Sequence, residues 1–380
     1  MKTKNIRTSE DLSSFIWDNY YCKSRWLGNS FNVSYLEERP HDLTLDPKRV
    51  YVSKTTPDRA EKDFLVFLNK IALIPQITAK IDASDTILIK ANFAPASQKA
   101  YHYFTNPRYV NLLIKYLQNE GFSRIAIVES ETNAKLGHSQ LTPQFIGKRL
   151  GFEGTIIDLS TEKQEPIRWK RSTVDLASIM LNPKNFIINF AKPKNHDLMF
   201  FTGALKNMYG SIPHFNKWRL FHKKESGLSV AEAILMVNYS SPADLILCDF
   251  VESIDGNEVS YFKHPITDFP YYYPNRFIAG KYPLSVDKYL ASKMGYGLEE
   301  SPVLKVVSDF THDYGIDASF IEGDTLDAFP DWKKVGLMLN LKAKTQDLLP
   351  VSNELVGKGI RMYEFSILRN DQIKRKIKRG

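Results

Sequence analysis

The segment Lys192–His222 gathers residue types that can transfer protons, form covalent bonds or bind metal ions. His196 precedes Lys206 by 206 − 196 = 10 residues, and His222 follows it by 222 − 206 = 16 residues. A lysine in a partly desolvated cleft near other cations has a lowered pKa, which suits Schiff-base formation, covalent attachment of a cofactor or general-base catalysis. A histidine can transfer protons near neutral pH or ligate a metal. We therefore interpret Lys206, His196 and His222 as candidate catalytic residues, and His222 also as a candidate metal ligand.

Each of these residues also has an ordinary structural interpretation. A single histidine is often a core or surface residue with a satisfied ring, and a single lysine is often exposed on a helix. Thr202 and Asn207 flank Lys206 with small polar groups that can hydrogen-bond a substrate. His214 and Lys217 either line the same cleft or lie on a solvated loop. On a loop that follows a central strand, the combination favours function.

Further polar residues stand at or just after the ends of apolar runs that we predict to be buried strands. These runs are TILIKAN (86–92), RIAIVES (124–130) and NFIINFAK (185–192). The polar residues are Lys90, Asn92, Glu129, Glu131, Lys192 and Lys194. Parallel strands place their functional loops at their carboxyl ends, so these side chains should converge on one edge of the sheet. The basic residues and Asn92 would bind a substrate carboxylate or phosphate and Glu129 would act as a base; the alternatives are ordinary strand-end polar groups and acids at a helix start.

Strands and helices alternate along the chain. After TILIKAN, the apolar positions of PRYVNLLIKYLQNEG recur at helical spacing, with Pro107 at the start and Gly121 at the stop. A helix is predicted near 142–150, a strand over TIIDL, a helix over LSVAEAILMVNYS, and a strand over 243–250. This order predicts an α/β fold with a mostly parallel sheet flanked by helices.

The same pattern suggests a division of the chain. We predict an irregular N-terminal arm over 1–49 and an α/β core domain with the Lys/His site over 50–240. A second, smaller α/β lobe over 241–350 would cover the site, and a C-terminal segment with a basic tail, IKRKIKRG, would occupy 351–380. Such a tail is usually solvated.

Composition excludes several classes of protein. No run of about 18 apolar residues occurs, and no apolar segment follows the basic start, so neither a membrane span nor a secretion signal is expected. Cys22 and Cys248 are the only cysteines among 380 residues, which excludes a disulfide framework and a cysteine-ligated zinc or iron–sulfur site. A reducing cytoplasm is the expected location. Part of the net charge of +8 lies in the basic tail, which could also contact nucleic acid or anionic lipid. The lysines at the ends of apolar runs, Lys90, Lys192, Lys194 and Lys206, fit an anionic small-molecule substrate; nucleic acid is not expected as a partner, and a homo-oligomer is left open.

Common catalytic and nucleotide-binding motifs are absent from the sequence. It contains no G-x-G-x-x-G after a strand, no G-x-x-x-x-G-K-[ST], no H-E-x-x-H and no G-x-S-x-G. The usual dinucleotide, triphosphate, zinc-protease and α/β-hydrolase sites are therefore not predicted.

The chain resembles the DUF-362 group, a domain of unknown function. The resemblance is carried by IKANFAP (89–95), the stretches 105–130 and 186–213, LILCDF (245–250) and FIAGKYPLSVDKYLASKMG (277–295). Its densest patch is K-x-x-H followed by T-G-x-L-K-N-x-x-G and a downstream histidine. Many members carry a ferredoxin-like cysteine cluster, which two cysteines cannot hold. In the family a G-x-D-P-x-x-x-D type of pattern recurs; here it reads AGKYPLSVD, which favours Asp287 as a substrate-binding residue over an acid at a helix start.

A more distant resemblance links the chain to the nickel-pincer lactate racemase family. That family has a histidine, a lysine and a histidine at the separations found for His196, Lys206 and His222. The resemblance implies that His196 transfers a proton, that Lys206 carries a nickel-pincer nucleotide and that His222 ligates the nickel. The family's other catalytic histidine falls where this chain has VESETN, so Glu129 or Glu131 would replace it.

Taken together, these features predict an enzyme that acts on an anionic small molecule next to a carbonyl or carboxylate group. The expected chemistry is racemisation, epimerisation or a related proton or hydride transfer, with or without a bound metal. Two alternatives remain open. One is a redox or biosynthetic tailoring enzyme that uses an external electron donor, and the other is a non-catalytic protein that binds an anionic ligand or assists maturation.

Overall fold

The computed structural model describes residues 2–6, 22–27, 30–35, 45–46, 49–93, 102–131, 142–169, 172–196, 198–213, 217–222, 225–255, 271–314 and 321–335. For residues up to 35, and for Trp218, Arg219, His222 and Ile321, it describes the backbone only.

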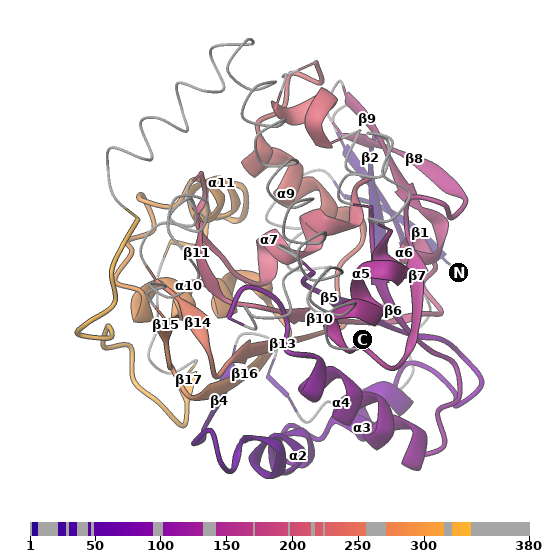
Figure 1. The fold of residues 1–380 in the computed structure, drawn as a ribbon. Coiled ribbons are helices and arrows are strands. Elements are labelled where there is room, and N and C mark those ends of the chain that lie inside the picture. Colours follow the sequence, from indigo (N-terminus) through magenta and orange to yellow (C-terminus); the bar gives the residue numbers. More distant parts are fainter. Residues whose placement is uncertain are drawn as a thin grey trace, which may run out of the picture.

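An eight-stranded sheet forms the centre of the described fold, with the order β17-β4-β16-β13-β10-β5-β6-β7 (Figure 1). In chain order the strands are β4 (Val50–Lys54), β5 (Ile87–Ala91), β6 (Ile125–Glu129), β7 (Thr155–Asp158), β10 (Phe186–Ala191), β13 (Leu245–Phe250), β16 (Arg276–Gly280) and β17 (Ile321–Glu322). Of these strands, β16 alone runs antiparallel to its neighbours β13 and β4. The predicted α/β class with a mostly parallel sheet is confirmed.

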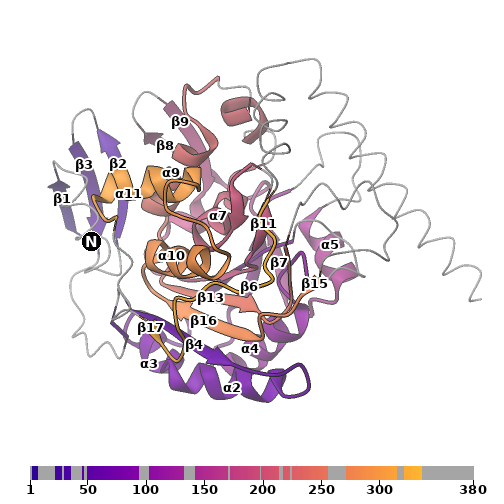
Figure 2. The ribbon, with the colours of Figure 1, turned by 90° about the vertical axis from the view of Figure 1, so that its left-hand side faces the viewer.

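Helices cover both faces of this sheet (Figures 1 and 2). One face carries α2 (Ala60–Lys70), α3 (Leu73–Thr78), α4 (Pro107–Asn119) and α5 (Pro143–Leu150). The other carries α6 (Ser178–Leu181), α7 (Ala204–Met208), α9 (Val230–Ser240), α10 (Pro283–Lys293) and α11 (Pro302–Thr311). Along β10, Ile188 and Phe190 pack into the hydrophobic core on the face covered by α2 to α5, while Ile187 and Ala191 pack into the core on the opposite face. Burial on both faces explains why the strands are continuous apolar runs in the sequence.

Local signals fix the helix starts. The side chain of Asn106 accepts a hydrogen bond from the backbone N–H of Arg108, and Pro107 occupies the first turn of α4. Ser229 and Glu232 form a capping box at the start of α9. These contacts satisfy backbone groups that a helix end leaves without partners, so the predicted helices begin within a residue or two of the expected places.

Smaller elements surround the main sheet. A three-stranded antiparallel sheet has the order β1 (Lys2–Ile6), β3 (Ser30–Tyr35) and β2 (Cys22–Leu27). Three further strand pairs are β8 (Gln164–Trp169) with β9 (Ser172–Ala177), β11 (Lys194–His196) with β12 (Phe200–Thr202), and β14 (Ser253–Ile254) with β15 (Tyr271–Tyr272). A 3-10 helix, η2 (Tyr209–Ser211), and a π-helix, η3 (Lys217–His222), complete the described elements.

The N-terminal residues differ from the irregular arm predicted for 1–49. In β3, Phe31, Val33 and Tyr35 alternate with polar residues, which is the period of a strand, and β2 contacts β8 and α9. The boundary predicted at residue 240 lies within one sheet, because β13 pairs with β10 across it. The predicted C-terminal segment, 351–380, lies outside the described residues.

The strand order reverses between β5 and β10. From β5 the chain moves outward through β6 to β7, whereas β10 and β13 lie on the other side of β5. In open α/β sheets, ligands bind outside the carboxyl ends of the strands at such a reversal. The candidate site is therefore sought at the carboxyl ends of β5, β6, β10 and β13, which we call the carboxyl edge.

Candidate functional site

A buried ion pair joins the carboxyl ends of β5 and β6. The Nζ atom of Lys90 lies 2.9 Å from Oε2 of Glu129 and donates a second hydrogen bond to the carbonyl oxygen of Ala91 at 2.8 Å. Oε1 of Glu129 accepts a hydrogen bond from the backbone N–H of Ser130 at 2.9 Å. The predicted convergence of Lys90 and Glu129 is thus confirmed, although their roles stay predictions.

A second lysine, Lys217, approaches this pair from η3. Its Nζ atom donates a 3.4 Å hydrogen bond to Oγ of Ser130 and lies 5.7 Å from the centre of the Tyr209 ring. Oγ of Ser130 also contacts the carbonyl oxygen of Ile212 at 2.8 Å. None of the ion pairs between described side chains involves Lys217. The ammonium group therefore lies against a hydroxyl and an aromatic face, and no carboxylate among the described side chains binds it directly.

The pKa of Lys217 reflects these surroundings. Burial disfavours the charged amine and lowers its pKa from the ordinary value to about 8. The carboxylates of Glu129 and Glu131 oppose this shift, and the cation of Lys90 adds to it. The residue keeps part of its surface exposed to solvent. A lysine with these properties carries a useful fraction of neutral, nucleophilic amine near neutral pH.

Gly210 leaves the space that this cluster needs. A Cβ atom at this position would lie 2.6 Å from Nζ of Lys90 and 2.8 Å from Oε1 of Glu129. Both distances are too short for ordinary van der Waals contact. Any residue other than glycine would displace the ion pair. This close approach explains Gly210, one of the two glycines, with Gly203, that lie on either side of Lys206 in the sequence.

Asparagine side chains tie the central strands to α7. Nδ2 of Asn207 donates to the carbonyl oxygen of Lys90 at 2.9 Å and to Oδ1 of Asn189 at 2.8 Å. Oδ1 of Asn207 accepts a 3.2 Å hydrogen bond from Nδ2 of Asn92. Asn92 and Asn207, both predicted as substrate-binding residues, are therefore brought together. Their hydrogen bonds fasten α7 to β5 and β10, the two strands between which the strand order reverses.

Asp287 contacts the backbone at the start of α7. Its two carboxylate oxygens accept hydrogen bonds from the N–H groups of Ala204, at 2.6 Å, and Leu205, at 3.0 Å. Burial raises the pKa of Asp287 to about 7, while both backbone hydrogen bonds lower it. A Cβ atom at Gly203 would collide with this carboxylate. The observed contacts make Asp287 a residue that positions α7, and its predicted contact with substrate is untested.

A second buried ion pair lies at the ends of β10 and β13. Nζ of Lys192 is 2.9 Å from Oδ2 of Asp249, and neither side chain is exposed. The same oxygen accepts a hydrogen bond from the backbone N–H of Asn106 at 2.9 Å. Lys192 thus has a structural partner that the sequence did not reveal.

His102 lies near this second pair. Its ring stacks on Tyr271 with 3.9 Å between centroids, and neither ring nitrogen has a hydrogen-bond partner among the described atoms. Burial, assisted by the charge of Lys192, lowers the pKa of His102 to about 3. The imidazole is therefore neutral at physiological pH.

The predicted residues of the β11–β12 hairpin take separate positions. Lys194 and Thr202 occupy paired positions in the hairpin, and Nζ of Lys194 lies 5.3 Å from the centre of the Tyr103 ring. Nδ1 of His196 accepts hydrogen bonds from the N–H groups of Leu198 and Met199, at 3.2 and 3.3 Å. This bonding leaves Nδ1 unprotonated and Nε2 as the nitrogen that can carry a proton.

Lys206 lies in the middle of α7 and is partly buried, next to Asn207. His214 and the side chain of His222 lie outside the described residues, so the Lys/His/His arrangement and the nickel ligand remain predictions. Among the described side chains, no group of three His, Cys, Asp or Glu residues is placed to hold a metal ion. Cys248 is a free, buried residue of β13, and burial raises the pKa of its thiol.

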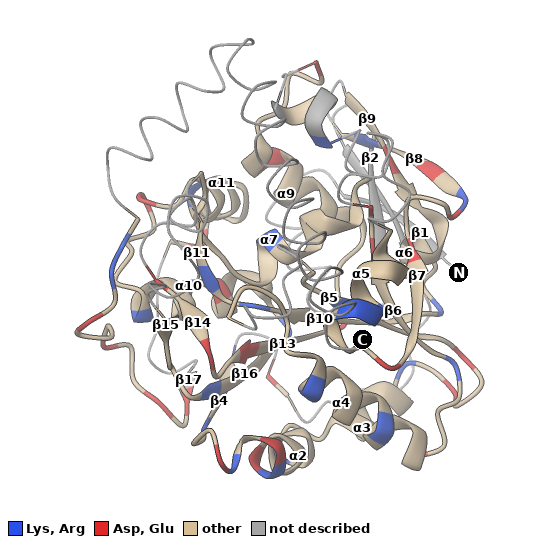
Figure 3. Cartoon of the chain, viewed as in Figure 1, with Lys and Arg blue, Asp and Glu red and all other residues tan. Residues whose placement is uncertain are grey.

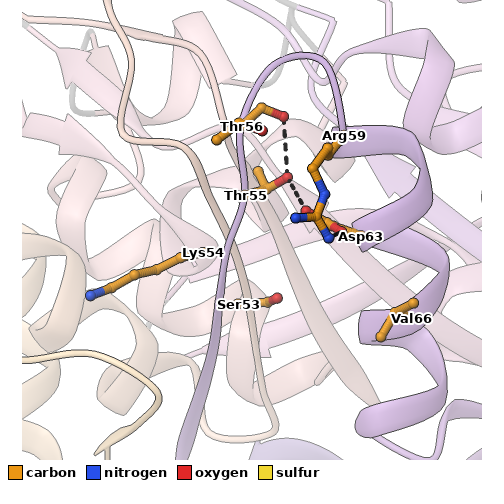
Figure 4. A pocket seen from close by; sticks show the side chains of 7 residues that line it. All are labelled: Ser53, Lys54, Thr55, Thr56, Arg59, Asp63 and Val66. Carbon is orange, nitrogen blue, oxygen red and sulfur yellow. Dashed lines mark hydrogen bonds and ion pairs between the residues drawn. The ribbon is translucent and has the colours of Figure 1, made fainter.

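A surface pocket lies elsewhere, at the end of β4 and the start of α2 (Figure 4). Oγ1 of Thr55 donates to Oδ2 of Asp63 at 2.8 Å, and Arg59 pairs with Oδ1 of the same carboxylate at 3.3 Å. Two strands, β16 and β13, separate β4 from β10. Because its polar groups bind one another, this pocket has no evident reason to take a charged ligand.

Charge on the outer elements is mixed. Basic and acidic residues are interspersed over the elements seen in Figure 3. A basic residue also lies on α7, near the centre of the picture. None of the helices in the described part of the chain has both the length and the apolar composition needed to cross a bilayer.

Sequence reasoning did not single out two residues of this region, Ser130 and His102, and left Lys217 either in the cleft or on a solvated loop. The one available signal was position, since Ser130 is the last residue of a predicted strand. The partners of Lys217 are distant in sequence, so no local pattern reports them.

Comparisons with known proteins identify one family. The profile of the family described as "Domain of unknown function (DUF362)" matches residues 87–292, which begin at β5, end within α10 and include the carboxyl ends of β5, β6, β10 and β13. No curated protein matches the chain. A crystal structure of a Thermotoga maritima protein is similar with a TM-score of 0.32 and 12% identity, over 50% of this chain and 50% of that chain.

Proposed function

The chain belongs to the DUF362 family, and we propose that it is an enzyme that binds an anionic small molecule at the carboxyl edge and transfers a proton next to its carbonyl or carboxylate group. One observation carries the proposal: Lys217, whose pKa is lowered to about 8, lies beside the buried Lys90–Glu129 pair. General-base catalysis is most effective when the pKa of the base lies near the working pH.

The charges of the site support an anionic ligand. Lys90 and Lys192 are each neutralised by a carboxylate, whereas Lys217 contacts only a hydroxyl and an aromatic ring among the described residues. A ligand carboxylate or phosphate would supply a directly paired counter-charge, which none of the described side chains supplies to Lys217. Binding the anion would also raise the pKa of Lys217, which lets it hold the proton that it removes.

Racemisation and epimerisation need a second proton-transfer group on the opposite face of the substrate. Lys206 and His196 are the proposed candidates, since α7 is fixed against the site by Asn207 and Nε2 of His196 can carry a proton. If the nickel-pincer nucleotide implied by the distant resemblance is bound, Lys206 would carry it and the group would supply hydride-transfer chemistry.

Proton exchange tests the proposal even while the reaction product is unidentified. The full-length protein is incubated in D2O with a panel of 2-hydroxy acids, 2-oxo acids and their phosphorylated analogues, and deuterium incorporation next to the carbonyl or carboxylate group is followed by NMR. Incorporation with at least one acid, lost in Lys217→Met, is expected. Incorporation that Lys217→Met leaves unchanged would contradict the proposal. Binding of these acids without exchange would favour a non-catalytic ligand-binding protein.

A further inference from the structure

We infer that Lys217 is a covalent nucleophile that forms a Schiff base with the aldehyde or keto group of an anionic substrate. This inference rests on the proposed function and specifies both the substrate class and the residue that bonds to it. It assigns the reactive amine to Lys217, in place of the Lys206 amine indicated by sequence spacing.

The contacts of Lys217 suit an amine that must be reactive as well as basic. An ion pair would hold the nitrogen lone pair in an N–H bond, but none of those between described side chains includes this residue. The contacts of Nζ are the hydroxyl oxygen of Ser130 and the face of the Tyr209 ring. Neither contact prevents the loss of a proton from the amine, and the partly exposed side chain allows a substrate to reach it.

Charged groups surround Lys217 from several elements. Glu129 at the end of β6 and Glu131 just beyond it favour the ammonium form, whereas burial and Lys90 at the end of β5 favour the neutral amine. Tyr209 from η2 contributes an uncharged ring. Because burial is the largest influence, the neutral amine is populated near neutral pH.

The covalent step balances without an oxidant or a reductant. The lone pair of the neutral amine forms a C–N bond to the carbonyl carbon, and one amine proton moves to the carbonyl oxygen to give a carbinolamine. The C–O bond then breaks, and the oxygen leaves as water with the second amine hydrogen, leaving an imine. A protonated imine draws electrons from the neighbouring C–H bond, which makes that proton easier to remove. Because Lys217 is then bonded in the imine and no longer acts as the base, the proton passes to the neighbouring Glu129 carboxylate.

The ion pair of Lys90 and Glu129 has two uses in this step. The Glu129 carboxylate lies close enough to Lys217 to influence its protonation, so it can take part in proton movement to the departing oxygen. The nearby ammonium group of Lys90 disfavours the ammonium form of Lys217. Gly210 keeps both groups within reach because a side chain there would displace them.

Reductive trapping tests the inference. The full-length protein is incubated with glyoxylate, a small anion with an aldehyde group, and sodium cyanoborohydride, and the modified lysines are identified by peptide mapping. A single predominant adduct on Lys217 is expected. The rate should rise about tenfold per pH unit below about pH 8 and level off above it, because only the neutral amine attacks.

Three variants make the result decisive. Lys217→Arg should lose the adduct, and Lys217→Met serves as a second variant if the arginine does not fit. Lys281→Met is the matched control, because burial lowers the pKa of Lys281 to about 7 but the side chain is only 3% exposed. It should label like the wild type, and thermal unfolding confirms that each variant is folded.

Labelling spread over exposed lysines, or concentrated on Lys206 with Lys217 unmodified, would overturn the inference. Proton exchange that depends on Lys217 in the absence of any adduct would also overturn it while leaving the proposed function intact. If both exchange and adduct are absent, both proposals fail.

Discussion

The two ends of the parallel strands of the main sheet carry similar charged groups that differ in their exposure to solvent. We call the end at which β5, β6, β10 and β13 begin the amino edge. There, Nζ of Lys80 lies 2.7 Å from Oδ1 of Asp244, and Lys281 nearby has a pKa lowered to about 7. At the carboxyl edge, Lys90 pairs with Glu129 at 2.9 Å, and Lys217 has a pKa lowered to about 8. Each edge thus has a buried ion pair and a second lysine that burial makes less basic.

The lysines at the two edges differ in their hydrogen-bond partners and in their exposure. Lys80 also donates to the carbonyl oxygen of Asn185 at 2.7 Å, and the other oxygen of Asp244 accepts from the N–H of Ile187 at 2.7 Å, so this pair fastens the starts of strands. Lys281 is 3% exposed, whereas Lys217 is only partly buried and lies at the reversal of strand order. A lowered lysine pKa therefore does not identify a site by itself; on our proposal, exposure and position in the sheet distinguish the reactive Lys217 from the structural Lys281.

The largest expected difference between the edges is in catalysis. Lys217→Met removes the proposed base and should lower the rate of proton exchange about 10²- to 10⁴-fold. Lys281→Met changes a lysine of similarly low pKa at the other edge and should leave the rate within a factor of about two of the wild type. Exchange measured by NMR with the best acid of the panel compares the two variants. Equal losses would show that the edges do not differ in function.

Breaking either ion pair should destabilise the protein to a similar extent. Lys90→Met and Lys80→Met each leave a buried carboxylate without its cation, which costs about 3–5 kcal/mol in the free energy of unfolding. Urea unfolding measures this loss. The double variants Lys90→Met/Glu129→Gln and Lys80→Met/Asp244→Asn should recover part of the stability, because neither leaves an unpaired charge.

The rate of proton exchange should then distinguish the two double variants. The amino-edge double variant should retain proton exchange, while the carboxyl-edge double variant should lose it although its stability is partly restored. Loss of exchange in the amino-edge variant, at a temperature where it is folded, would argue against an exclusive role for the carboxyl edge.

A single methyl group at Gly210 should disturb the carboxyl edge alone. Gly210→Ala places a Cβ atom 2.6 Å from Nζ of Lys90, so the ion pair must move. Misplacement of catalytic groups by about 1 Å can cost on the order of 10²-fold in rate. Gly297→Ala is a matched control, since its Cβ would meet its nearest neighbour at an ordinary 3.5 Å. Unchanged proton exchange in Gly210→Ala would mean that the pair's position does not matter.

The smallest effect expected is a gain of stability at the amino edge. Burial lowers the pKa of Lys281 in the folded state to about 7. The buried side chain therefore reduces the free energy of unfolding at neutral and lower pH, and this reduction disappears as the pH rises toward the pKa of lysine in the unfolded state. Lys281→Met should therefore stabilise the protein at pH 7 by on the order of 1 kcal/mol, with a difference that declines toward pH 10. Thermal unfolding across this range measures it; a difference that grows with pH would contradict the assignment.

The main sheet could be predicted from sequence because its strands are buried on both faces. Continuous apolar runs at 86–92, 124–130 and 185–192 predicted β5, β6 and β10, and Pro107 and Gly121 located the two ends of α4. The alternation of strands with helices predicted parallel strands, whose carboxyl ends bring Lys90 and Glu129 together; the order of the strands was not predicted.

The site was less predictable because its contacts cross long sequence distances. Ser130 meets Lys217 across 87 residues, and Lys192 meets Asp249 across 57. Burial, which sets the pKa of Lys217, depends on that tertiary packing and has no signature in the local sequence. The spacing of His196, Lys206 and His222 drew attention to the segment that contains Lys217 but could not show which lysine lies beside the ion pair.

The most direct test of the central claim is the titration of individual lysines by competitive labelling. Trace acetic anhydride is applied to the folded protein over a range of pH, and peptide mapping gives the reactivity of each lysine. Our account predicts that Lys217 reacts with a midpoint near pH 8, while Lys281 at the amino edge remains unreactive because solvent cannot reach it. A midpoint for Lys217 at the ordinary lysine value, or equal reactivity of both residues, would contradict it.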